Sequence, residues 1–174
     1  MRLFIAINFN NETRTRLVAL CNELRSSKHG RFTLPENLHL TLAFLGECSV
    51  EQTASVKAAM DAVEIKPFDL VIERIGRFKR DDGDIWWAGI EENRALADLQ
   101  SRLTEKLIAE DFSFNKRKYN PHITLGRMVV TNVKPHSIVP FRETVSRIDL
   151  MKSERINGIL MYKSIYQCSD KEVL

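Results

Sequence analysis

One four-residue pattern occurs twice in the sequence, as His-Leu-Thr-Leu at residues 39–42 and as His-Ile-Thr-Leu at residues 122–125. Each copy lies in an apolar run that predicts a strand, over residues 38–45 and 121–125. Because side chains alternate along a strand, the histidine and threonine of each copy share one face and the aliphatic residues share the other. We expect the aliphatic face, which includes Phe44, to pack into a core. The polar faces would then present two imidazoles and two hydroxyls to one central cleft.

A single His-x-Thr triplet is weak evidence, because such triplets arise by chance and a histidine in a strand is more often structural. The two copies, however, share aliphatic spacers, a strand context and nearby Pro and Asn residues upstream, at 35–37 and 120–121. The chain has only two other histidines, His29 and His136. The pair therefore predicts an acid–base site built from His39 and His122.

Composition limits the classes of protein to consider. With 174 residues and 44% hydrophobic residues, the chain can form one large domain or two small lobes that share a core. We expect a single domain, residues 1–174, made of two interleaved lobes. A net charge of +3 does not indicate a strong non-specific DNA binder, but it suits a small anion or the end of an RNA as the ligand.

The cysteines are odd in number, with no CxxC pair, which indicates reduced thiols in the cytoplasm. The apolar N-terminal run is too short for a signal peptide or a membrane span, and it predicts a first strand.

Hydrophobic periodicity predicts the remaining elements. Helices are expected over 11–26, 49–63 and 93–109, and strands over 2–9, 68–78, 85–90, 144–152 and 159–168. His29 and His136 are expected in loops. Strands outnumber helices and helices separate neighbouring strands, so we predict an α+β fold with mostly antiparallel sheet. A helix and a loop precede each motif strand, which indicates a bilobal, pseudo-twofold duplicated architecture with the helices outside.

These motifs resemble those of the two-histidine (2H) phosphoesterases, and within them the LigT-type RNA 2′,3′-cyclic phosphodiesterases, historically called 2′-5′ RNA ligases. The resemblance is carried by residues 2–7, 37–46, 67–68, 75–78, 86–89, 120–127 and 150–162. It implies a bilobal α+β fold and cleavage of a cyclic phosphodiester without a metal or other cofactor.

The chemistry of that reaction suits the paired motifs. Opening a 2′,3′-cyclic phosphate requires a base for the attacking water and an acid for the departing ribose oxygen, and histidine titrates near neutral pH. In-line displacement places the two groups on opposite sides of the phosphorus. Thr41 and Thr124 can each donate a hydroxyl hydrogen bond to a non-bridging phosphate oxygen. The resemblance favours His39 as the acid and His122 as the base that activates water.

Three further residues are candidates for contacting substrate. Arg127 matches the arginine that follows the second motif in the family, and a guanidinium can grip phosphate through two bonds. Strict alternation places Arg127 on the far face from the histidine, unless a bulge at Gly126 redirects it. Phe44 and Tyr119 could each stack on a base, although each is equally expected to pack in the core.

A metal centre is not expected, because the histidines come paired with threonines whereas a catalytic zinc usually has three protein ligands. The basic run at residues 116–118 is expected to be solvated, and it could also guide an RNA backbone toward the cleft.

The sequence thus predicts a monomeric cytoplasmic enzyme that opens 2′,3′-cyclic phosphates on RNA ends or nucleotides, with a 2′-phosphate as the product implied by the resemblance. Two alternatives stay open. One is a phosphodiesterase or reversible ligase for 2′-5′-linked oligonucleotides, and the other is a non-catalytic module that binds RNA ends. No membrane partner is expected.

Overall fold

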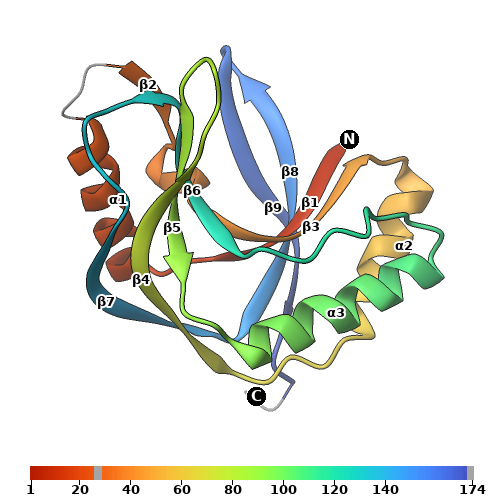
Figure 1. Ribbon diagram of the computed structural model, residues 1–174. Helices are drawn as coiled ribbons and strands as arrows, with labels where there is room; N and C mark the ends of the chain where they lie inside the picture. Colours follow the sequence, from red (N-terminus) through yellow and green to blue (C-terminus); the bar gives the residue numbers. More distant parts are fainter. Residues whose placement is uncertain (26–28, 172–174) are drawn as a thin grey trace.

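The computed structural model describes residues 1–25 and 29–171, and over these residues the predicted α+β class is confirmed (Figure 1). The first antiparallel sheet has the order β3-β1-β8-β9 and the second has the order β2-β6-β5-β4-β7. The strands of the first sheet are β3 (His39–Glu47), β1 (Arg2–Asn8), β8 (Arg147–Ile156) and β9 (Ile159–Ser169). Those of the second are β2 (His29–Phe32), β6 (His122–Val130), β5 (Asp84–Ile90), β4 (Phe68–Phe78) and β7 (His136–Val145).

The helices begin close to the predicted positions because each start carries a side-chain cap. They are α1 (Asn11–Arg25), α2 (Val50–Asp61) and α3 (Arg94–Ala109), and the predicted end of the first at residue 26 lies outside the described residues. The side chain of Asn10 accepts from the Thr13 amide at 2.8 Å, and Ser49 forms a capping box with Gln52. The side chain of Asn93 caps α3 by accepting from the Leu96 amide.

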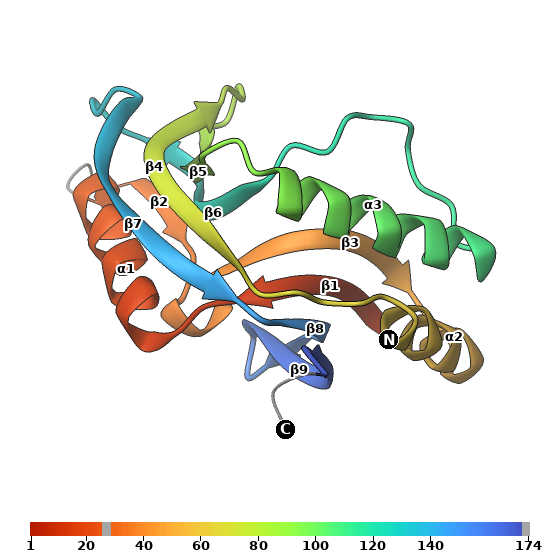
Figure 2. The ribbon, with the colours of Figure 1, turned by 90° about the horizontal axis from the view of Figure 1, so that it is seen from below.

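Helices lie on two sides of the molecule. Helix α1 contacts β2, β6 and β7, while α2 and α3 pack against each other at the opposite side, as two views of the ribbon show (Figures 1 and 2). Along the described part of the chain, no helix combines the length and the apolar character needed to cross a membrane.

One hydrophobic core joins the two sheets and the helices. Its buried side chains come from strands of both sheets and from every helix, and include Ile5, Leu17, Leu40, Met60, Leu70, Trp86, Leu103, Ile123 and Leu150. A smaller cluster on the other face of β1 contains Phe4, Ala6 and Met151, with Tyr162 packed against it. Strand β1 is therefore covered on both faces.

Several predicted loops and boundaries were wrong. His29 and His136 are the first residues of β2 and β7 rather than loop residues. The single strand predicted over 144–152 is two strands in different sheets. Val145 pairs with Phe68 of β4, whereas Arg147 pairs with Ser169 of β9, so the chain passes from one sheet to the other at residue 146. Local periodicity cannot reveal such a crossing, since both segments have strand character.

The fold repeats one arrangement at the two motifs. Helix α1 precedes β3 and helix α3 precedes β6, and the strands β3 and β6 contact each other where the two sheets meet. The two motif strands therefore meet at the junction of the sheets.

Candidate active site

A main-chain carbonyl group holds each motif histidine in the same way. The Nδ1 atom of His39 lies 2.7 Å from the carbonyl oxygen of Asn37, and that of His122 lies 2.8 Å from the carbonyl oxygen of Asn120. Because a carbonyl oxygen only accepts, Nδ1 carries the hydrogen in both rings. In the neutral form, Nε2 then carries the lone pair and acts as an acceptor, and in the charged form it is a donor. Each Nε2 can therefore take or give a proton.

Aromatic rings set the orientation of both imidazoles. The ring of His39 lies 4.9 Å from Phe4 and 5.2 Å from Tyr162, which it meets edge to face at 86°. The ring of His122 meets Phe78 at 5.2 Å and 89°. Edge-to-face contacts of this kind limit the rotation of a side chain and exclude water from one side of the ring.

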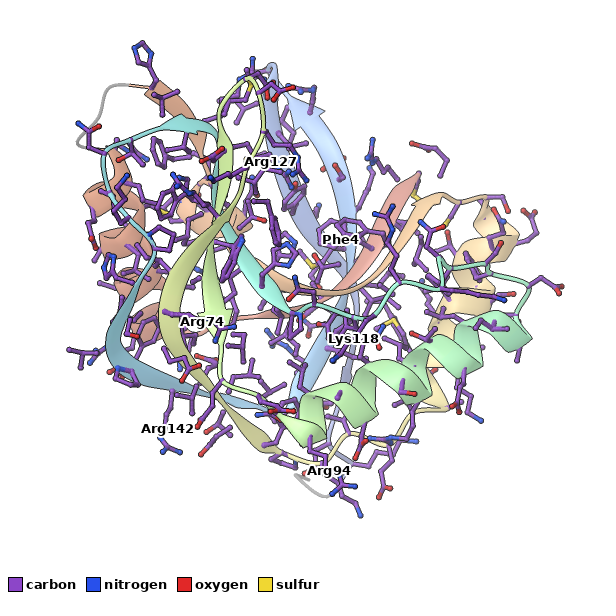
Figure 3. The ribbon with its side chains drawn as sticks, viewed as in Figure 1. Phe4, Arg74, Arg94, Lys118, Arg127 and Arg142 are labelled. Atoms are coloured by element: carbon purple, nitrogen blue, oxygen red, sulfur yellow. The ribbon has the colours of Figure 1, made fainter. Side chains whose placement is uncertain are left out.

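His122 and Arg127 are close enough to His39 to influence its pKa. Burial is the main cause that lowers the pKa of His39 below its usual value of 6.5, and the hydrogen bond to the Asn37 carbonyl opposes it. The charges of His122 and Arg127 lower the pKa of His39 further. The two histidines and the arginine come from β3 and β6, which contact each other, so the structure brings the two motif strands together; Figure 3 labels Phe4 and Arg127 in this region.

The two threonines are half-buried on the same strand faces as the histidines. The Oγ1 atom of Thr41 lies 3.0 Å from Nε2 of His39. Thr124 lies beside Trp87 in the register of β6 and β5, on the face that carries His122. The Thr41 hydroxyl therefore lies at Nε2 of His39, and Thr124 shares the strand face of His122.

A bulge in β6 determines where Arg127 points. Thr124 pairs with Trp87, but the preceding residue of β5, Trp86, pairs with Gly126, so Leu125 is an extra residue on β6. Leu125 and Gly126 are both buried, and Arg127 is exposed on the side of His39. The expectation from strict alternation, with Arg127 on the far face, is wrong, because the extra residue shifts the alternation by one.

The same irregularity in β3 redirects Phe44. Ile5 pairs with Ala43 and Ala6 pairs with Thr41, so Leu42 is an extra residue at the position that matches Leu125. Phe44 is consequently 68% exposed, and its ring lies 6.1 Å from that of Phe4. The prediction that Phe44 packs on the core face is wrong for the reason that applies to Arg127. Both residues stand five positions after a motif histidine.

Tyr119 connects the two motifs. Its hydroxyl group donates to the main-chain oxygen of Thr41 at 2.8 Å, and its half-buried ring packs against the core. Burial raises the pKa of this hydroxyl above its ordinary value. These contacts favour a structural role for Tyr119, whereas the ring of Phe44 is exposed. The basic residues 116–118 just before Tyr119 are exposed.

Sequence analysis missed the residues that surround the histidines. Phe4, Tyr162 and Phe78 come from strands remote in sequence, and strand alternation alone could have placed Phe4 opposite its core-facing neighbours. Asn37 is buried, and its side chain donates to the Leu160 carbonyl and accepts from the Tyr162 amide. No sequence signal indicates that link to β9.

The polar groups around the imidazoles are hydroxyls, carbonyls and a guanidinium. Within residues 1–25 and 29–171, no three His, Cys, Asp or Glu side chains gather in a way that could hold a metal ion.

Comparisons with known proteins identify the family. The model of the LigT-like phosphoesterases matches residues 7–87 and 89–161. The chain belongs to the LigT-like phosphoesterase family. The family and the class of enzyme predicted from the sequence are therefore confirmed.

Individual relatives extend this result. The chain is 31% identical to an RNA 2′,3′-cyclic phosphodiesterase of Archaeoglobus fulgidus, over 80% of this chain and 79% of that protein. It is 29% identical to a Thermotoga maritima protein of the same name, over 97% of this chain and 95% of that protein. Among solved structures, Escherichia coli LigT in complex with 3′-AMP superposes with a TM-score of 0.85 at 27% identity, covering 98% of each chain.

Proposed function

We propose that this phosphoesterase hydrolyses 2′,3′-cyclic phosphates on RNA ends or nucleotides to 2′-phosphates, by acid–base catalysis that needs no metal. One observation carries the proposal. Two imidazoles are each held through Nδ1 by a main-chain carbonyl, with the Thr41 hydroxyl 3.0 Å from Nε2 of His39 and with Thr124 on the strand face that carries His122. Acid–base catalysis of phosphoryl transfer uses such a set of groups.

In the proposed reaction, His122 removes a proton from water as the water oxygen attacks phosphorus. The bond from phosphorus to O3′ breaks, and His39 protonates the departing O3′, so the phosphate stays on O2′. Thr41, Thr124 and Arg127 donate hydrogen bonds to the non-bridging oxygens, where charge develops in the transition state. Phe44 supplies an exposed aromatic face for the terminal base.

The assignment of His39 as the acid has a specific requirement. In the structure without substrate, burial and neighbouring positive charges lower the pKa of His39, which favours the neutral ring. A bound phosphodiester anion would offset those positive charges and favour the protonated ring. We therefore propose that substrate binding charges His39.

The names of the relatives support the substrate class, since those with 28–34% identity are RNA 2′,3′-cyclic phosphodiesterases. The nucleotide in the complex of E. coli LigT supports a nucleotide as the ligand.

The test is incubation of the purified chain with a 2′,3′-cyclic mononucleotide and with an oligonucleotide that ends in a 2′,3′-cyclic phosphate, both in EDTA. We expect turnover of at least one substrate and a 2′-phosphate product, distinguished from the 3′-isomer by chromatography. Activity that EDTA abolishes and a metal restores would overturn metal independence, and a 3′-phosphate product would overturn the proposed bond cleavage. Tight binding without turnover would instead support a module that binds RNA ends.

A further inference from the structure

The side chain of Arg74 lies on the same face of the second sheet as His122. Ile72 pairs with Ile90 while Arg74 pairs with Gly89, so Glu73 is an extra residue in β4. This break in register puts Ile72 and Ile75 in the core and turns Arg74 to the other face. Gly89 in turn pairs with His122. Arg74, Gly89 and His122 thus form one row across three neighbouring strands.

The absence of a side chain at Gly89 lets Arg74 reach toward His122. A Cβ atom built on Gly89 would lie 2.7 Å from Cγ, 2.8 Å from Nε and 2.9 Å from Cζ of Arg74. The guanidinium group therefore lies directly over Gly89, about 4.8 Å, one strand spacing, from β6. The ring of Trp87, 5.8 Å from Cζ, supports the guanidinium from one side.

Among the described residues, hydrogen bonds to a single nitrogen of the guanidinium group hold it in place. Nη1 donates to the carboxylate of Glu73 at 2.7 Å and to the carbonyl oxygen of Ile90 at 3.0 Å. Nε and Nη2 have no hydrogen-bond partner among the residues that the structure describes. They form the edge of the guanidinium group that grips a phosphate through two parallel bonds. Since the side chain is 42% exposed, this edge is accessible.

Arg74 and Arg127 lie toward opposite ends of the stretch of β6 that carries His122 and Thr124 (Figure 3). We propose that Arg74 binds a second phosphate, the phosphodiester on the 5′ side of the terminal nucleotide, while Arg127 serves the reacting phosphate. This proposal rests on the proposed function, and it names an RNA strand rather than a mononucleotide as the preferred ligand. A nucleoside with only a cyclic phosphate lacks the group that Arg74 binds.

The proposal is tested by calorimetric binding of two ligands, a nucleoside 2′-phosphate and a dinucleotide whose 3′-terminal nucleoside carries a 2′-phosphate. Arg74→Ala should weaken binding of the dinucleotide about 10-fold, the usual effect of losing one charged hydrogen-bonded contact, and leave binding of the mononucleotide unchanged. The slope of log affinity against log salt for the dinucleotide should fall by about 0.7, which corresponds to one phosphate contact on a single strand.

Arg142→Ala is the matched control, because it removes the same charge from the same sheet. Arg142 lies on the neighbouring strand β7, 72% exposed, and pairs with Asp69 at 3.9 Å. We expect this variant to bind both ligands like the unmodified chain. Arg74→Lys should recover only part of the lost affinity, since an ammonium cannot form the two parallel bonds.

Two variants test the position of the guanidinium group without removing it. Gly89→Ala should push Arg74 off the sheet, and it should lower dinucleotide affinity relative to mononucleotide affinity. Glu73→Gln keeps an acceptor for Nη1 and removes a negative charge beside the site, so it should tighten dinucleotide binding.

The proposal would be overturned if Arg74→Ala lowered the affinity for both ligands equally. It would also be overturned if Arg142→Ala lowered the dinucleotide affinity as much as Arg74→Ala does. Hydrolysis of a 2′,3′-cyclic mononucleotide is measured in parallel. Without turnover in the unmodified chain the proposed function fails, while the difference between the two ligands still decides the role of Arg74.

Discussion

At the scale of single residues, the two histidines have the same main-chain contact but different surroundings. His39 contacts Phe4 and Tyr162, and its pKa is lowered, whereas the ring contact of His122 is with Phe78. The proposed mechanism needs one charged and one neutral imidazole, and such a difference favours it, because identical rings would compete for one proton.

Replacing either histidine should nearly silence the enzyme. His39→Ala and His122→Ala should each lower kcat by about 10²–10⁴-fold, the usual contribution of a general acid or base. Thr41→Val and Thr124→Val should cost less, because each removes one hydrogen bond to the phosphate. Circular dichroism serves as the control for folding, and near-normal turnover in either folded alanine variant would remove that histidine from the mechanism.

A substrate with a good leaving group separates the roles of the two histidines. A phosphodiester of nitrophenol needs no protonation of its leaving oxygen, so it should restore much of the activity of His39→Ala while His122→Ala stays inactive. Steady-state kinetics on both substrates gives the comparison. The reverse pattern of rescue would exchange acid and base.

The lowered pKa of His39 also predicts how the pH profiles differ. The profile of kcat/KM reports the free enzyme and that of kcat reports the bound complex. Because a bound phosphate anion would raise the pKa of His39, activity should fall at higher pH in the kcat profile than in the kcat/KM profile. The acid and alkaline limbs of each profile belong to the two histidines as a coupled pair, and not to one residue each. If the alkaline limbs of the kcat and kcat/KM profiles coincided, substrate binding would not favour the protonated form of His39.

At the scale of elements, breaks in register determine which side chains reach the site. One extra residue in each of β3, β4 and β6 turns Phe44, Arg74 and Arg127 to the face of the histidines. In β3 and β6 the extra residue is the leucine that ends the motif. A bulge of this kind changes the direction of a side chain without changing the strands that pair, so it builds a site on a regular sheet.

The hydroxyl group of Tyr119 links the strand of the first motif to the segment before the second. Tyr119→Phe leaves the Thr41 carbonyl without this donor, and it should lower the free energy of unfolding by about 1–3 kcal/mol. Because the link joins the two halves of the site, kcat should fall as well. Urea unfolding and steady-state kinetics measure the two effects.

Tyr166→Phe is the control, since it removes a hydroxyl that bonds to the exposed carboxylate of Asp61. It should change neither stability nor kcat appreciably. If the two tyrosine variants behaved alike, Tyr119 would not couple the motifs.

At the scale of the whole molecule, the core is shared between both sheets, so we propose that residues 1–174 unfold as one domain. Trp86 and Trp87, both on β5, report on the second sheet through their fluorescence, and the buried Cys48 lies after β3 of the first sheet. In urea, the fluorescence change and the labelling of Cys48 by a thiol reagent should occur at the same concentration. A variant with the other cysteines replaced isolates the signal, and two separate transitions would indicate two independent lobes.

The sequence by itself determined the family, the α+β class, the helix starts and the two polar strand faces. These follow from interactions within a few residues, such as capping and the alternation of side chains along a strand. The repeated motif was informative because its histidine and threonine lie two residues apart, where alternation still holds.

Only the tertiary structure decided how the chain departs from that alternation and which strands pair. The bulges at Leu42, Glu73 and Leu125 depend on the register that a neighbouring strand imposes, and that strand is remote in sequence. The same holds for the crossing at residue 146 and for the rings of Phe4, Tyr162 and Phe78 around the histidines. Pairing between distant strands is settled by burial of a common core, and this is why Phe44, Arg74 and Arg127 could be placed only in the folded molecule.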